Sequence, residues 1–132
     1  EWTIGAHRAH FEEPDLLVVK YNGKFTLAEA RLVLELYREV GSQRPYFLLA
    51  DIQGAEIESD ARKHLVDGLQ PEWFLAIVYA GASPVMRAVG KAMAVALYFT
   101  GRWRTEFQFT ATAEEGRALI ARMREKQQPR RA

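Results

Sequence analysis

The chain has 132 residues, with 18 Lys and Arg against 17 Asp and Glu, three His and no Cys. This length suits one domain, and 48% hydrophobic with 27% charged residues is ordinary for a globular protein. The absence of Cys excludes a disulfide framework, a thiolate metal site and a cysteine nucleophile. A net charge of +1 argues against a nucleic-acid partner.

Strands and helices are predicted to alternate after an initial β-hairpin. Apolar and β-branched runs predict strands at residues 2–11, 16–21, 46–52, 73–79 and 105–110. Capping residues and apolar residues at helical spacing predict helices at residues 26–40, 59–70, 84–100 and 112–126. Residues 46–52 are almost continuously apolar, which is typical of a strand buried on both faces of a parallel sheet.

This order predicts a single α/β domain over residues 1–127, followed by a flexible basic tail at 128–132. The sheet should be mixed and mainly parallel, with about five strands, about four helices and right-handed crossovers. In the strand at 105–110, Phe107 and Phe109 are two residues apart and should face the same side.

Four carboxylates surround the loop after the strand that ends at Ile52: Asp51, Glu56, Glu58 and Asp60. Ligands of open α/β sheets bind outside the carboxyl ends of strands, so this loop is a candidate site for a divalent ion or for acid–base chemistry. The alternative, which we favour, is a solvated loop in which Asp51 accepts hydrogen bonds from local amides.

The sequence has no recognisable catalytic or metal-binding motif. His7, His10 and His64 lack the spacing of a metal site, and no nucleophile-elbow, dinucleotide or P-loop pattern occurs. We therefore expect no catalytic residues, no metal and no cofactor.

The helix at residues 84–100 is unusual in its composition. Between Trp73 and Thr105 there is no Asp or Glu. A helix that is apolar nearly all round packs in the core or on a second subunit, or it faces an apolar ligand or an anionic membrane surface. An exposed apolar helix would also favour a homodimer. The candidate residues for an apolar-ligand or membrane surface are Val85, Met86, Arg87, Val89, Lys91, Met93, Leu97, Tyr98, Arg102, Trp103 and Arg104.

A family resemblance extends over nearly all of the chain, and five stretches of the sequence carry it: Asp15–Gly23, Tyr46–Ile52, Ser59–Arg62, Gly81–Ser83 and Phe107–Ala118. In this order they resemble the STAS-domain superfamily, and within it the SpoIIAA-like (STAS/SEC14) group of small bacterial proteins. The resemblance implies a sheet with helices packed against it and no enzymatic activity. It also implies an association with lipids or other apolar ligands on the SEC14-like side of the group, which fits the helix at 84–100.

The resemblance further draws attention to Ser59. In anti-sigma-factor antagonists of the superfamily, a partner kinase phosphorylates a Ser that begins the helix after the central strand, within a pattern Asp-Ser-Ser-Gly. The corresponding stretch here is Glu58-Ser59-Asp60-Ala61, so Asp60 stands where the acceptor would be. Ser59 is therefore interpreted as a phosphoacceptor or as a helix N-cap, and Asp60 either mimics a permanent charge or marks the absence of the switch.

We expect a non-enzymatic regulatory or protein-interaction module. Its partner-binding residues would be Asp51, Glu56, Glu58, Ser59, Asp60 and Arg62. The alternative is an apolar-ligand, lipid-binding or membrane-surface module that uses the helix at 84–100. The N-terminus lacks the features of a signal peptide, so we expect a cytoplasmic protein, peripheral at the membrane under the alternative.

Overall fold

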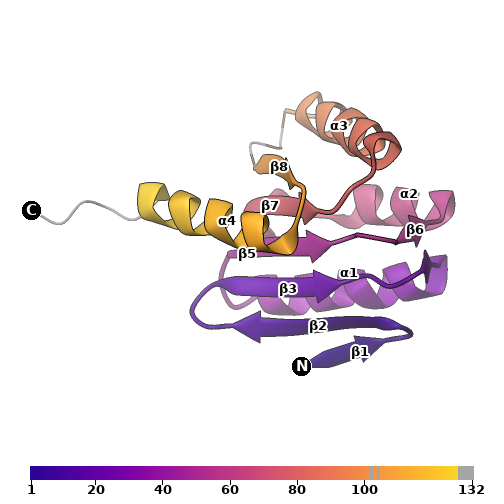
Figure 1. Ribbon diagram of the computed structural model, residues 1–132, viewed down its shortest axis with the longest axis horizontal. Coiled ribbons are helices and arrows are strands. Elements are labelled where there is room, and N and C mark those ends of the chain that lie inside the picture. The colour runs from indigo at the N-terminus through magenta and orange to yellow at the C-terminus, as the bar shows by residue number, and fades with distance from the viewer. Residues whose placement is uncertain (102, 104, 128–132) are drawn as a thin grey trace, which may run out of the picture.

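The computed structural model describes residues 1–101, 103 and 105–127; the expected basic tail at 128–132 lies outside them. Within these residues the main sheet has six strands, in the spatial order β1-β2-β3-β5-β7-β8 (Figure 1). These strands are β1 (Trp2–Ile4), β2 (His7–Glu12), β3 (Leu16–Lys20), β5 (Tyr46–Asp51), β7 (Phe74–Ala80) and β8 (Glu106–Thr110). The helices are α1 (Leu27–Gly41), α2 (Ser59–Gly68), α3 (Pro84–Tyr98) and α4 (Ala113–Gln127), with a 3-10 turn, η1, at Pro71–Trp73.

The strand pairing confirms the predicted fold class. β1 pairs with β2 and β2 with β3 in antiparallel fashion, while β3–β5, β5–β7 and β7–β8 are parallel. The sheet has six strands rather than about five because the predicted first strand is two strands. Gly5 has a φ of 60° between β1 and β2, and this conformation lets the chain turn back on itself.

A second, two-stranded parallel pair joins β4 (Lys24–Phe25) to β6 (Glu56–Ile57). These strands cannot be predicted from the sequence, because a strand of two residues is too short to show a hydrophobic period. The pair holds the segment before α1 against the segment before α2. It therefore places the starts of both helices near the carboxyl end of β5.

The central strands are buried on both faces. Leu17 and Leu48 belong to the cluster under α1 and α2, whereas Phe47 and Leu49 belong to the opposite cluster under α4 (Figure 1). All four side chains are at most 2% exposed. This alternation confirms the expectation that residues 46–52 form a strand covered on both sides.

Helix α4 is tied to the β2–β3 hairpin by two bidentate ion pairs. Arg117 donates to both carboxylate oxygens of Glu12 at 2.8 and 2.7 Å, and Arg124 donates to both oxygens of Asp15 at 3.0 and 2.6 Å. Hydrogen bonding from Arg117, together with that from His10, lowers the pKa of Glu12 to about 2. Glu12 is therefore ionised throughout the neutral range.

The predicted N-caps are confirmed at α1 and α3 but not at α2, although α2 begins at Ser59 as predicted. Thr26 and Glu29 form the predicted capping box, and the Ser83 hydroxyl accepts from the Met86 amide at 3.2 Å. Ser59, in contrast, is the first residue of α2, and Glu58 occupies the cap position without a side-chain hydrogen bond. The predicted Ser59 cap is wrong because the chain turns into the helix directly after β6.

Substitution of two hydroxyl residues tests this assignment. Thr26→Ala should lower the free energy of unfolding by about 1 kcal/mol, because an amide at the start of α1 loses its acceptor. Ser59→Ala should change the free energy of unfolding by less than about 0.5 kcal/mol, because the Ser59 side chain is exposed and makes no cap hydrogen bond. Urea denaturation of both variants measures the difference, and equal losses would show that Ser59 does cap α2.

Candidate functional site

A cavity of about 50 Å³ lies between α2, α3 and the face of the sheet that carries α1. The strands contribute its floor, with Leu48 from β5, Ile77 and Tyr79 from β7, and Phe107 and Phe109 from β8. The prediction that Phe107 and Phe109 share one side is thus confirmed. Such a volume holds water-sized molecules, so a larger ligand needs a wall that moves.

Helix α3 forms the roof of the cavity. The side chains of Met86, Val89 and Met93 line it, as does the backbone at Gly90. A Cβ atom built on Gly90 would lie 2.6 Å from Cζ of Phe109, so the absence of a side chain lets the helix approach the ring.

The attachment of α3 to the rest of the domain is limited. Of its 15 residues, only Ala94 and Leu97 are buried. Figure 1 shows the helix set apart at the β8 end of the sheet, and Gly81 and Gly101 flank it with φ angles of 78° and 77°. A helix with so little buried apolar surface costs less to displace than one packed along its whole length.

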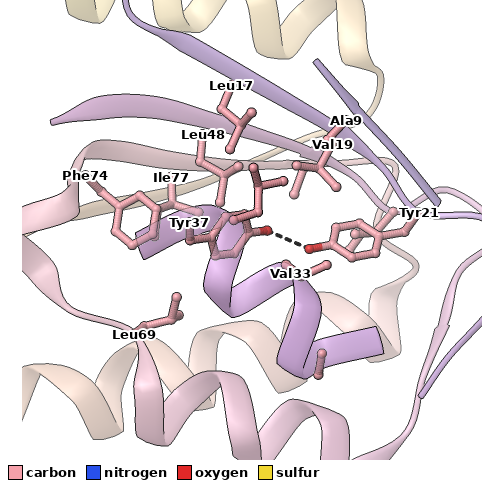
Figure 2. Close-up of a cluster of buried hydrophobic side chains, with 14 of the residues drawn as sticks. Ala9, Leu17, Val19, Tyr21, Val33, Tyr37, Leu48, Leu69, Phe74 and Ile77 are labelled. Atoms are coloured by element: carbon pink, nitrogen blue, oxygen red, sulfur yellow. Dashed lines mark hydrogen bonds between the residues drawn. The ribbon is translucent and has the colours of Figure 1, made fainter. Parts of the chain in front are cut away.

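Three tyrosines also line the cavity. The hydroxyls of Tyr21 and Tyr37 lie 2.6 Å apart and form a hydrogen bond between the end of β3 and α1 (Figure 2). The Tyr79 ring stacks on Phe109 with 5.7 Å between ring centroids. Burial raises the pKa of Tyr21 and Tyr37 above the ordinary value and raises that of Tyr79 to about 12. All three phenols therefore keep their protons near neutral pH and can donate hydrogen bonds.

Arg62 is the one charged residue among the described residues that line the cavity. It lies on α2, one turn before Leu65, and its side chain is half-buried. In the described part of the chain, no carboxylate lies within ion-pair distance of its guanidinium. Arg62 is predicted from the sequence to belong to the partner-binding loop, whereas the structure places it at the cavity.

The outward face of α3 is apolar as well. Val85, Val95 and Phe99 are 73%, 52% and 86% exposed, and Ala88 and Ala92 lie between them on the same stripe. The residues recur at alternating intervals of three and four, which places them along one side of the helix. The roof helix therefore has an apolar inner face toward the cavity and an apolar outer face toward solvent.

The residues predicted for an apolar-ligand or membrane surface divide into several groups. Val85, Lys91 and Tyr98 are exposed, and Arg87 is half-buried with its Nε buried and without a hydrogen-bond partner among the described residues. The prediction is wrong for Leu97 and Trp103, which are buried in the core; the Trp103 ring packs on Phe74 and Phe107. Arg102 and Arg104 lie outside the described residues. As described above, Met86, Val89 and Met93 line the cavity.

The carboxylates around the loop after β5 do not form a common site among the described residues. Asp51 lies 3.4 Å from Lys20 Nζ and accepts from the Gln53 amide, while Asp60 accepts from the Ala61 amide. Glu56 is exposed in β6, and Ser59 is exposed at the start of α2. Among the described residues, no three His, Asp or Glu side chains are arranged to hold a metal ion.

One buried polar residue was not foreseen from the sequence. His7 is only 1% exposed, although the short β-strand around it has no motif that marks a buried histidine. Its Nδ1 accepts from the Asn22 amide and its Nε2 donates to Glu29, each at 2.9 Å. Because Glu29 also belongs to the α1 capping box, this network links β2 to the start of α1. Its partners are far apart in sequence, so no local pattern indicates it.

Comparison with solved structures defines the fold class. The anti-sigma factor antagonist SpoIIAA, solved in its unphosphorylated form, superposes with a TM-score of 0.66 at 14% identity over 88% of this chain and 98% of that chain. The chain therefore has the SpoIIAA-like fold, as the STAS resemblance implied. An uncharacterized DUF3478-family protein with a SpoIIAA-like fold from Shewanella loihica PV-4 matches with a TM-score of 0.52 at 20% identity, over 79% of this chain and 83% of that chain.

Comparisons at the level of sequence identify no relative. No family model matches the chain, and no curated protein matches it. In the described part of the chain, no helix combines the length and apolar character needed to cross a membrane.

The tyrosine pair at the cavity has a measurable stability signature. Tyr37→Phe should lower the free energy of unfolding by about 1–3 kcal/mol, because it leaves the buried Tyr21 hydroxyl without its partner. The double variant Tyr21→Phe/Tyr37→Phe should cost less than the sum of the two single variants, since no unpaired hydroxyl remains. Urea denaturation of all three gives the coupling, and strictly additive losses would contradict it.

Proposed function

We propose that this protein is a non-enzymatic binding module that takes a small apolar molecule into the cavity beneath α3. The observation that carries the proposal is the cavity itself, with aliphatic, methionine and aromatic side chains on its floor and roof. Ligand sites of this kind combine an apolar lining with a few polar groups that fix orientation. Here the polar groups are the three phenols and the guanidinium of Arg62.

Two properties of the roof support entry of a ligand larger than the present cavity. Met86 and Met93 are unbranched and flexible, so they can rearrange around an apolar guest. The small buried surface of α3 makes an outward displacement inexpensive, and the ligand would replace the contacts that the roof loses. Binding would stabilise the fold by RT ln(1 + L/Kd), where L is the free ligand concentration, so the stabilisation would grow with the logarithm of ligand concentration above the Kd.

A second candidate function is regulatory binding of a protein partner at the start of α2. The observation that favours it is the exposure of Ser59 and Asp60 next to the β4–β6 pair, in a chain that shares the fold of an anti-sigma factor antagonist. A phosphate on Ser59 would lie at a helix N-terminus, where the helix dipole stabilises negative charge. The carboxylates of Glu58 and Asp60 would oppose it.

A bulky substitution on either face of α3 tests the cavity. Wild-type protein should bind the neutral fluorophore N-phenyl-1-naphthylamine, and Met93→Trp should weaken its Kd at least about tenfold by filling the cavity. Ala92→Trp is the matched control, because Ala92 is exposed and should leave the Kd unchanged. Fluorescence titration measures both. Equal binding by wild type and Met93→Trp would place the ligand elsewhere, and no binding by wild type would contradict the proposal.

The second candidate predicts a covalent phosphate. Incubation with ATP and an extract of the host cells should add a phosphate mass that peptide mapping places on Ser59, and Ser59→Ala should abolish it. Phosphate on another residue, or none, would count against a switch at this position. Because the Ser59 side chain makes no cap bond, loss of the phosphate in Ser59→Ala would not reflect unfolding of α2.

A further inference from the structure

We propose that the molecule bound beneath α3 is an amphiphile with a single carboxylate, and that Arg62 pairs with this carboxylate. The inference rests on the proposed ligand-binding function and assigns the chemical class of the ligand. It follows from the charge and the hydrogen-bonding groups that line the cavity.

The lining of the cavity carries a positive charge. Arg62 contributes one positive charge, and no Asp or Glu is among the described residues that line the cavity. Of the three half-buried arginines in the described chain, Arg124 pairs with Asp15, whereas Arg62 and Arg87 have no carboxylate within ion-pair distance. Of these two, only Arg62 lines the cavity, beside apolar side chains. A guanidinium in such surroundings gains more from an anionic partner than one in open solvent, because the local dielectric is lower.

The lining of the cavity also presents hydrogen-bond donors. The Tyr21 and Tyr37 hydroxyls share one hydrogen bond, which uses one of their two O–H donors and leaves the other free. The Tyr79 hydroxyl has no hydrogen-bond partner in the part of the chain that the structure describes. The phenols and Arg62 are therefore hydrogen-bond donors in the cavity lining, and a carboxylate can accept hydrogen bonds from them.

The position of the Arg62 guanidinium determines where the head group of the ligand would lie. A half-buried arginine covers apolar surface with its methylene stem and keeps its guanidinium toward the solvent side. The ligand's head group would accordingly lie near the mouth of the cavity on the α2 side, and its tail would extend toward Met86, Met93 and Phe109. A single carboxylate matches one guanidinium in geometry and charge, whereas a dianionic phosphate monoester would leave a charge without compensation.

Calorimetric titration with monomeric dodecanoate and with dodecanol tests the assignment. Wild-type protein should bind dodecanoate about tenfold more tightly than dodecanol, which corresponds to about 1.4 kcal/mol. Arg62→Gln should remove this preference by weakening dodecanoate alone, and Arg62→Lys should retain part of it. Arg31→Gln is the matched control, because Arg31 is an exposed arginine on α1 away from the cavity lining, and it should bind both as wild type does.

Each other outcome has a defined meaning. Equal binding of dodecanoate by wild type and Arg62→Gln would overturn the role of Arg62. A failure of wild type to bind dodecanoate while it binds N-phenyl-1-naphthylamine would overturn the carboxylate and leave the cavity function standing. If neither binds, both proposals fail. Binding that depends on Arg62 only with phosphatidylglycerol vesicles, and not with monomeric dodecanoate, would overturn the free amphiphile in favour of a membrane surface.

Discussion

The three central strands have no face toward solvent, and the rest of the architecture depends on this constraint. Side chains alternate across β3, β5 and β7, so helices must cover the sheet on both sides. Among the elements that the structure describes, only α4 covers one of these faces. The other face is covered by α1 and α2, while at the β8 end it is left to α3 (Figure 1). The cavity exists because this last cover is incomplete, with Phe107 and Phe109 only partly enclosed.

Much of this fold could be predicted from the sequence, and the exceptions share a physical cause. The doubly buried strand at Tyr46–Asp51 and the capping box at Thr26 are local signals, since apolar period and cap chemistry lie within a few neighbouring residues. The β4–β6 pair and the network around His7 depend on contacts between distant segments. A local pattern in the sequence describes one of the two segments in such a contact and does not identify the other.

The candidate site was predicted only in part for the same reason. The composition of residues 84–100 drew attention to the helix that roofs the cavity, but it could not say which side of that helix faces the cavity. Arg62, Tyr79 and Met86 meet at the cavity from α2, β7 and α3, and no spacing in the sequence links them. The apolar residues of α3 lie on two sides of the helix. Those on the inner side line the cavity, and those on the outer side are exposed.

The uneven distribution of charge has a consequence at long range. Four of the 18 Lys and Arg lie between Trp73 and Thr105 without any acidic residue, which leaves 14 against 17 Asp and Glu elsewhere. The molecule therefore carries a dipole moment that its net charge of +1 conceals. Two of these four cations, Arg87 and Lys91, lie on α3. Near an anionic surface, within a screening length of about 10 Å at 0.1 M salt, the field would therefore turn the molecule α3-first before any contact forms. On a cation exchanger, the protein would be retained longer than its net charge implies.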